Sequence, residues 1–140
     1  MPKHPVETAE VTVGGVAGDA QREREFHGGP DRALCLFSME LIRTLQAEGH
    51  PIAPGQIGEN LTVEGLDWDK VAPGARLLLG EDVLVEVTRY TSPCASIRTS
   101  FRGGEYARVS QKRHPGASRV YARVLRTGAI RRGDPVRLLP

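Results

Sequence analysis

Short strand-like segments, separated by turns rich in glycine and proline, recur along this chain and constrain its fold more than any other feature. Residues 6–13 alternate apolar and polar side chains, which is typical of a strand with one face on a core and the other in water. Further strand candidates come late in the sequence, over residues 75–80, 83–90, 118–128 and 134–140. The second half of the chain is therefore expected to be mostly β.

The middle of the chain contains the clearest helix signal. Residues 33–38 form a nearly continuous apolar run, as in a buried strand, and Ser38 can cap a helix over residues 39–49. The buried stripe of this helix is expected to consist of Leu41, Ile42 and Leu45. Residues 58–66 then indicate a loop that leads into another short strand.

Many short strands and only one or two short helices favour a mainly β fold with a minor α part. We expect a closed or partly closed β-barrel rather than an alternating α/β sheet. The length of 140 residues is usual for one domain, and the sequence shows no internal repeat and no linker. A single domain over residues 1–140 is predicted.

Cysteine usage and hydropathy bear on where the protein works. Two cysteines, Cys35 and Cys94, cannot provide a disulfide framework, and the N-terminus lacks the apolar stretch of a secretory signal. A reducing, cytoplasmic location is therefore expected. No run approaches the roughly 20 apolar residues that cross a bilayer, so no membrane association is expected.

The C-terminal third of the chain is distinctly basic, although the formal net charge is only +2. Its basic residues include Arg108, Lys112, Arg113, Arg119, Arg123, Arg126, Arg131 and Arg132. This asymmetry indicates either an anionic partner or a solvated basic face. A phosphate-bearing small molecule would satisfy the charge, and nucleic acid is not favoured because base-stacking aromatic residues are scarce here.

Cys94 is the leading candidate for chemistry. It follows the strand candidate at residues 83–90, so it is expected to emerge at a strand end, where a thiol can face a cleft. A thiolate is a strong nucleophile and a soft metal ligand, and Arg89 or Arg98 could lower the pKa of the thiol. The alternative is that Cys94 is a small buried hydrophobe, which is how we interpret Cys35.

Two further motifs place polar groups beside glycines. A loop expected over residues 18–32 contains His27, Gly28, Gly29, Asp31 and Arg32. Acid, base and anion-binding groups converge in this loop, although a turn with a local ion pair would explain the same residues. Glu59 and Asn60 add a carboxylate and an amide that can bind the edge of a heterocycle or cap a loop.

Other common sites find no support in the sequence. No CxxC or HExxH pattern occurs and the histidines are scattered, so a zinc site is not expected. Neither a GxGxxG fingerprint nor a P-loop is present, so nicotinamide and nucleoside triphosphate chemistry are not expected.

Taken in order, the motifs HGGPDRA, IGENL, the downstream PC and the closing G-x-I-x-x-GD make a specific combination. With these motifs, nearly the whole chain resembles the MOSC domain, named for the C-terminal domain of molybdenum cofactor sulfurases. The resemblance implies a MOSC-type β-barrel of mostly antiparallel strands.

The resemblance also implies roles for particular residues. The family cysteine falls on Cys94, which would be the catalytic residue, either as a ligand of molybdenum or as a carrier of persulfide sulfur. The residues expected to line or orient the pocket of the molybdenum cofactor (molybdopterin), bound transiently or retained, are His27, Gly28, Gly29, Asp31, Arg32, Glu59 and Asn60. The basic C-terminal half would hold the phosphate of the pterin.

Three functions follow as alternatives. The first is a molybdenum-dependent oxidoreductase that reduces N-hydroxylated small molecules, with electrons from a separate flavin or iron-sulfur reductase. The second is a sulfurtransferase-like carrier that docks on a cysteine desulfurase or a molybdoenzyme. The third is a non-catalytic interaction or structural domain with an inert, buried Cys94. Pyridoxal phosphate is expected on a partner desulfurase and not on this chain, which shows no lysine in a recognisable Schiff-base context.

Overall fold

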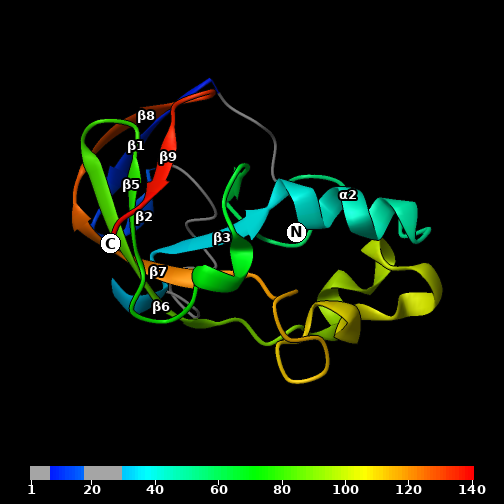
Figure 1. Cartoon of the computed structure of the whole chain (residues 1–140). Helices are drawn as coiled ribbons and strands as arrows, with labels where there is room; N and C mark the ends of the chain where they lie inside the picture. Colours follow the sequence, from blue (N-terminus) through cyan, green and yellow to red (C-terminus); the bar gives the residue numbers. More distant parts are fainter. Residues whose placement is uncertain (1–6, 18–29) are drawn as a thin grey trace.

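Two β-sheets form most of the computed structural model, which describes residues 7–17 and 30–140 (Figure 1). The larger sheet has the strand order β4-β3-β7-β6-β5-β9. In chain order, its strands are β3 (Leu34–Ser38), β4 (Leu61–Val63), β5 (Arg76–Leu79), β6 (Val83–Tyr90), β7 (Val120–Arg126) and β9 (Val136–Leu138). The smaller sheet, in the order β2-β1-β8, consists of β1 (Thr8–Thr12), β2 (Gly15–Val16) and β8 (Gly128–Arg131).

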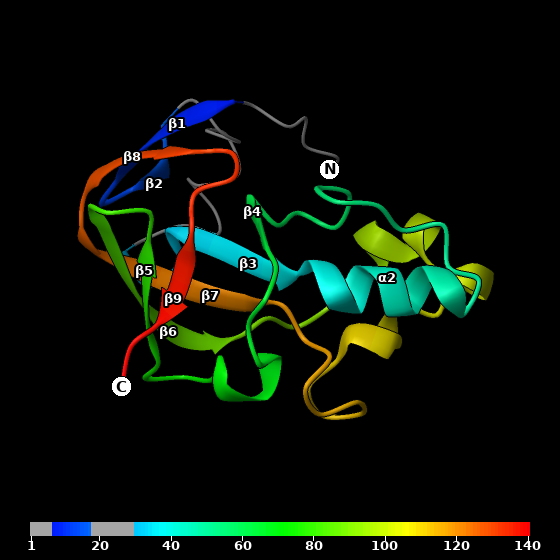
Figure 2. The ribbon, with the colours of Figure 1, turned by 45° about the horizontal axis from the view of Figure 1, so that its top comes forward.

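The junction of β7 and β8 connects the two sheets. Only Thr127 separates these strands, yet β7 pairs with β3 and β6 in the larger sheet whereas β8 pairs with β1 in the smaller one. The sheets therefore curve round a common interior, which Figures 1 and 2 show from two directions. Among the described residues, every strand pair is antiparallel except β3 with β4. This confirms the expected mainly β fold, a partly closed barrel of mostly antiparallel strands.

Strand β6 shows why these segments form strands. Val83, Val85 and Val87 are buried, whereas the residues between them are partly exposed. Branched side chains at every second position suit a pleated surface with one face on a core. The three valines belong to one buried cluster with Val11 of the smaller sheet and Leu34 of β3. The main core therefore lies between the two sheets.

Helix α2 (Met39–Ala47) follows β3 directly. Ser38 ends the strand and caps the helix, because its Oγ accepts a hydrogen bond from the Leu41 amide at 3.2 Å. Ile42 and Leu45 are buried, as predicted, whereas Leu41, the third residue of the predicted stripe, is only partly buried. The side chains of Ile42 and Leu45 pack in one buried cluster with residues that follow β6, among them Ile97 and Phe101.

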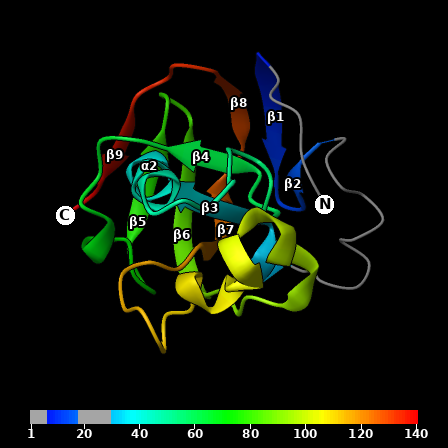
Figure 3. The same ribbon diagram turned by 90° about the vertical axis from the view of Figure 1, so that its right-hand side faces the viewer.

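Short 3-10 helices account for much of the remaining chain: η1 (Pro30–Arg32), η2 (Trp68–Lys70), η3 (Ala95–Ser100), η4 (Arg102–Gly104) and η5 (Tyr106–Val109). The last three lie beside α2 at one end of the barrel (Figure 3). A second buried cluster joins them to the helix and includes Phe37, Ile42, Leu45, Ile97, Phe101 and Val109. Within residues 7–17 and 30–140, no helix has the length and apolar character that a membrane span requires.

Candidate functional site

Cys94 lies on a short connection between β6 and η3. The strand ends at Tyr90 and the 3-10 helix begins at Ala95, so the thiol follows a strand end, as the sequence predicted. The start of this connection is fixed, because the Thr91 amide donates a hydrogen bond to the Arg119 carbonyl at 3.1 Å. Cys94 itself is exposed. The structure thus contradicts the alternative in which Cys94 is buried.

The surroundings of Cys94 favour its charged form. Its Sγ lies 2.8 Å from the Oγ of Ser96. Hydrogen bonds from the Ser96 side chain and backbone lower the pKa of the Cys94 thiol from its ordinary value of 9.0, and the positive charge of Arg119 lowers it further. Among the described residues, the cation that lowers this pKa is therefore Arg119 and not Arg89 or Arg98, the two arginines that the sequence suggested.

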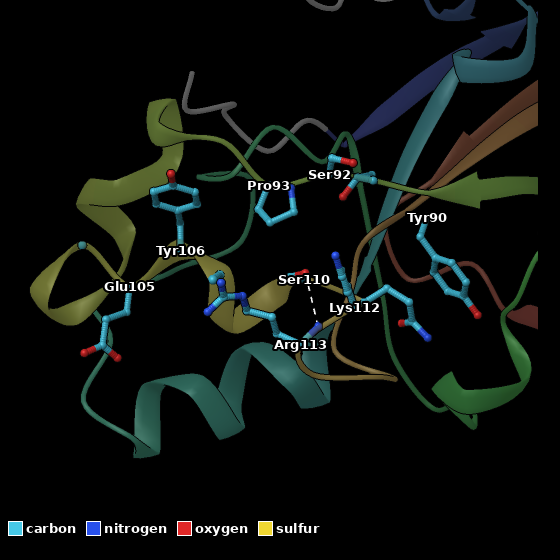
Figure 4. Close-up of a pocket in the computed structure, with 12 residues that line it drawn as sticks. Tyr90, Ser92, Pro93, Glu105, Tyr106, Ser110, Lys112 and Arg113 are labelled. Carbon is cyan, nitrogen blue, oxygen red and sulfur yellow. Dashed lines mark hydrogen bonds between the residues drawn. The ribbon is translucent and has the colours of Figure 1, made fainter.

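A pocket of about 760 Å³ lies next to the Cys94 connection. Its lining comprises Tyr90, Thr91, Ser92, Pro93, Gly104, Glu105, Tyr106, Ala107, Ser110, Gln111, Lys112 and Arg113. Figure 4 shows Lys112 and Arg113 between Tyr106 on one side and Tyr90 on the other. Cys94 is not itself a lining residue, but it follows the lining residue Pro93 in the chain, and its thiol is exposed.

The pocket combines positive charge with aromatic surface. Lys112 and Arg113 form no ion pair with any residue that the structure describes. Their charges are therefore available to an anionic ligand, in line with the basic character of this part of the sequence. Tyr90 and Tyr106 are both partly exposed and can contact a planar ligand.

Arg119 connects the loop that contains Gly58, Glu59 and Asn60, here called the GEN loop, to the Cys94 connection. Its Nη1 donates a hydrogen bond to the Ile57 carbonyl at 2.6 Å, while its backbone carbonyl holds the Thr91 amide. The side chain is buried, with 8% exposed. Sequence reasoning counted Arg119 only as one of several basic residues. The sequence signal that could have identified Arg119 is its position near the start of the strand predicted over residues 118–128, between two residues that are buried in the structure.

Glu59 lies in the same buried region. The residue is 1% exposed, and its Oε1 accepts a hydrogen bond from the Ile57 amide at 3.3 Å. Burial raises the pKa of the Glu59 carboxyl, and the charge of Arg119 opposes that shift in part. Three buried polar atoms in this region have no hydrogen-bond partner among residues 7–17 and 30–140: Glu59 Oε2, Thr91 Oγ1 and Arg119 Nε.

Asn60 fastens the GEN loop to strand β3. Its side-chain Oδ1 accepts a hydrogen bond from the Cys35 backbone amide at 2.9 Å, and the backbone amide of Asn60 donates to the Cys35 carbonyl at 3.0 Å. Cys35 is buried within the strand, as predicted. The side-chain oxygen of Asn60 is thus hydrogen-bonded to the backbone of β3. The predicted role of this side chain toward a cofactor stays a prediction.

Asp31 and Arg32 lie on the outer side of strands β6 and β7. Asp31 is exposed, with its Oδ1 3.6 Å from Arg123 Nη1, and its carbonyl accepts a hydrogen bond from Thr88 at 2.5 Å. The Arg32 guanidinium lies 5.3 Å from the centre of the Tyr121 ring.

The other predicted residues of this loop, His27, Gly28 and Gly29, lie outside the described residues. Their proposed contacts with a cofactor stay predictions.

The part of the chain that the structure describes holds no group of three or more His, Cys, Asp and Glu side chains placed to bind a metal ion.

Comparisons with known proteins identify relatives. Residues 23–137 match the MOSC domain. The chain is 33% identical over 123 residues to YflK of Bacillus subtilis (strain 168), covering 87% of this chain and 54% of YflK. It is also 33% identical over 105 residues to YiiM of Escherichia coli (strain K12), covering 72% of this chain and 46% of YiiM. A protein of Gibberella moniliformis named "Reductase" is 32% identical over 129 residues, which cover 89% of this chain and 22% of that protein.

Solved structures show the same fold. The crystal structure of YiiM from Escherichia coli superposes with a TM-score of 0.74 at 28% identity, covering 99% of this chain and 65% of that one. YiiM from Geobacillus stearothermophilus gives a TM-score of 0.65 at 30% identity, covering 80% of this chain and 56% of that one. The chain spans about half the length of YflK and of the Escherichia coli YiiM.

Proposed function

Because the chain belongs to the MOSC domain family, we propose that it binds a molybdenum cofactor beside Cys94 and reduces N-hydroxylated compounds there. One observation supports this most: an exposed thiol, in surroundings that favour the thiolate, belongs to a connection whose preceding residues Thr91, Ser92 and Pro93 line a pocket of about 760 Å³. The name of the Gibberella relative, a reductase, agrees with this type of reaction.

The residues around the pocket fit such a cofactor. The volume of about 760 Å³ lies within the roughly 300–1,000 Å³ that small-molecule sites occupy. Lys112 and Arg113 would bind the phosphate of the pterin, because they are cations at the pocket without ion-pair partners among the described residues. Cys94 would bind the molybdenum, because a thiolate is a soft ligand. The bound cofactor would supply the redox chemistry that amino-acid side chains lack.

The side chains of the pocket would bind and orient the substrate. Reduction of an N-hydroxyl group to an amine consumes two electrons and two protons and releases water. Tyr90 and Tyr106 provide aromatic surface for a planar substrate, and Ser92 and Ser110 provide hydroxyl groups that can donate or accept hydrogen bonds. A substrate held between the tyrosines would be positioned with its reacting group toward Cys94.

Electrons for this reaction would come from a separate flavin or iron-sulfur reductase. An iron-sulfur cluster takes about four cysteine ligands, whereas this chain has two cysteines, one of them buried in β3. The electron donor is therefore proposed as a partner of this chain.

Sulfur transfer is the second candidate function, and the exposure of Cys94 favours it. An exposed thiolate can attack the terminal sulfur of a persulfide carried by a cysteine desulfurase. The new S–S bond would form on Cys94, and the desulfurase cysteine would leave as a thiolate with the electron pair of the broken bond. This function needs a docked partner but no retained metal.

Metal and pterin analysis separates these functions. We would purify the wild-type protein, Cys94→Ser and Cys35→Ala from a molybdenum-replete host and quantify molybdenum, oxidised pterin and sulfane sulfur. Cofactor ligation predicts molybdenum and pterin in the wild-type and Cys35→Ala proteins and their loss from Cys94→Ser. Sulfane sulfur on Cys94 without metal would overturn cofactor ligation and support the carrier. Absence of metal, pterin and sulfane sulfur from all three proteins would overturn both functions.

A further inference from the structure

A second, smaller pocket adjoins the one beside Cys94. It has a volume of about 150 Å³, and its lining comprises Trp68, Asp69, Tyr90, Gln111, Pro115 and Gly116. Tyr90 and Gln111 also line the larger pocket, so the two spaces meet at these side chains. We call the smaller pocket the Trp68 subsite. The cleft therefore has two compartments, one beside Cys94 and one beside Trp68.

The size and walls of the Trp68 subsite suit a single aromatic ring. A cavity of about 150 Å³ is large enough to hold benzene. Trp68 and Tyr90 provide flat aromatic surface. Trp68 is held in place, because its Nε1 donates a hydrogen bond to the Ser118 carbonyl at 2.9 Å and Phe37 packs edge-on against its ring at 6.3 Å. This wall is therefore formed before any ligand arrives.

The polar groups of the subsite present one acceptor and one donor. Asp69 has no side-chain hydrogen bond or ion pair with the described residues, and its carboxylate accepts hydrogen bonds only. Its Oδ1 lies close to Gly116, where a Cβ would be 2.5 Å away. The Gln111 Oε1 accepts a hydrogen bond from the Gly116 amide at 3.0 Å, which leaves its Nε2 as a donor.

From this arrangement we propose that the Trp68 subsite binds an amino-substituted nitrogen heterocycle of one six-membered ring. The amino group would donate to Asp69, and the neighbouring ring nitrogen would accept from the Gln111 Nε2. The ring would contact Trp68 and Tyr90. An aminopyrimidine has this acceptor–donor edge, whether it is a separate base or the end of a larger ligand.

Tyr90 and Gln111, which line both pockets, connect the Trp68 subsite with the larger pocket. A ligand anchored in the Trp68 subsite would extend past Tyr90 and Gln111 into the larger pocket, whose lining includes Pro93, the residue before Cys94. The subsite would thus select the ring of a ligand whose remaining part lies beside the thiol. Only this last step rests on the proposed function.

Trp68 allows a direct test, because it is the only tryptophan of the chain. We would titrate the cofactor-free, full-length protein with 2-aminopyrimidine and with pyrimidine, following tryptophan fluorescence and calorimetric heat. Pyrimidine has no amino group to donate a hydrogen bond to Asp69, so it should bind about tenfold more weakly than 2-aminopyrimidine. Equal affinity for the two rings, or no response of Trp68, would overturn the proposal.

Three variants test the assigned contacts. Asp69→Asn removes the charge, and Gln111→Glu keeps an oxygen for the Gly116 amide while replacing the donor with an acceptor. Each is expected to reduce the tenfold preference to about threefold or less. The matched control, Glu81→Gln, changes an exposed carboxylate in the turn between β5 and β6 and should keep the full preference. Full preference in both Asp69→Asn and Gln111→Glu would overturn the proposal.

Competition experiments would show whether the ring that binds the Trp68 subsite belongs to the cofactor or to the substrate. The same edge occurs in the pyrimidine ring of a pterin and in the amino tautomer of N-hydroxylated pyrimidine bases. Tighter displacement of 2-aminopyrimidine by pterin would assign the subsite to the cofactor, and tighter displacement by N4-hydroxycytosine would assign it to the substrate. Displacement by neither compound would overturn the proposal.

The outcome is independent of molybdenum loading. Fluorescence of Trp68 requires neither the metal nor the thiol, so Cys94→Ala should bind 2-aminopyrimidine as the wild type does. Failure of metal binding with intact ring binding would overturn the proposed function alone. Loss of ring selectivity in a protein that still binds molybdenum would overturn only the Trp68 subsite.

Discussion

At the scale of single residues, the hydroxyl of Ser96 contributes most to lowering the pKa of the Cys94 thiol. Ser96→Ala removes the contact at 2.8 Å, so the pKa should rise toward 9.0. A higher pKa means a smaller thiolate fraction at neutral pH. We expect alkylation of Cys94 by iodoacetamide at about pH 7 to slow about threefold to tenfold, as measured by mass spectrometry over time.

Two variants control this measurement. Cys94→Ala should abolish the fast alkylation, because Cys35 is buried. Thr99→Ala removes an exposed hydroxyl from the same 3-10 helix and should leave the rate unchanged. An unchanged rate in Ser96→Ala would show that this hydroxyl does not stabilise the thiolate.

Glu59 links protonation to folding. Burial raises the pKa of its carboxyl above the ordinary value of 4.5, so the folded protein holds this proton more tightly than the unfolded chain does. The resulting stability is fully present below pH 4.5 and is lost as pH rises through the raised pKa. In Glu59→Gln this side chain cannot ionise. The free energy of unfolding of the variant should therefore increase relative to that of the wild type as pH rises.

Urea unfolding at a series of pH values measures this difference. Glu81→Gln changes an exposed carboxylate and should follow the wild-type profile. Parallel profiles of the wild type and Glu59→Gln would contradict a raised pKa at Glu59.

The sequence motifs singled out Cys94 and Glu59 but not the contacts of Arg119. Cys94 and Glu59 stand in short motifs, so they could be named without a structure. Arg119 bonds Thr91 because β6 and β7 pair in one register, and its side chain reaches Ile57 from a distant part of the sequence; neither long-range contact is visible in local sequence. For that reason the buried connection between the two motifs appears only in the folded chain.

At the scale of elements, the cap of α2 gives a prediction about stability. The Ser38 Oγ accepts a hydrogen bond from the Leu41 amide, and an N-cap of this type contributes about 1 kcal/mol. Ser38→Ala should therefore lower the free energy of unfolding by about 1 kcal/mol, measured by urea denaturation. Thr44→Ala, at an exposed position within the helix, should have a smaller effect or a stabilising one. Equal losses in both variants would contradict the capping role.

Elements with strong local signals were predicted well. The strand predicted over residues 83–90 has the same bounds as β6 (Val83–Tyr90), and the helix predicted over residues 39–49 is α2. This helix ends earlier than predicted, at Ala47, because Gly49 has a φ of 97° that a helix does not accommodate. Strong alternation and a clear cap therefore sufficed for these two elements.

Elements without a local signal were missed. Strand β2 has two residues, too few for a periodic pattern, and β8 follows β7 so closely that the sequence gives no boundary between them. The 3-10 helices η3 to η5 lack the apolar period of a longer helix and depend on their packing against α2. Tertiary contacts, rather than local preference, determine this part of the fold.

At the scale of the whole molecule, Gly15 marks a place where the smaller sheet closely approaches the start of β3. It has a φ of 115°, and a Cβ at this position would lie 2.2 Å from the Ala33 carbonyl oxygen. Gly15→Ala should therefore force β2 away from the start of β3 and destabilise the protein by about 3 kcal/mol or more.

A second glycine separates crowding from backbone strain. Gly133 has a φ of 90° and nothing within 4 Å of its added Cβ, so Gly133→Ala should cost only about 1 kcal/mol. Thermal and urea unfolding of both variants measures the difference. Equal destabilisation would mean that the close approach of the sheets contributes nothing.

The near-continuity of β7 and β8 has a consequence for folding. One length of chain, residues 120–131, supplies a strand to each sheet, with Thr127 alone between them. A chain cut at Thr127 would leave the N-terminal fragment without β8 and β9, so neither sheet would be complete in one fragment. The two fragments should therefore stay unfolded when separate and recover the barrel when mixed, as expected of a structure whose halves form in a single cooperative step.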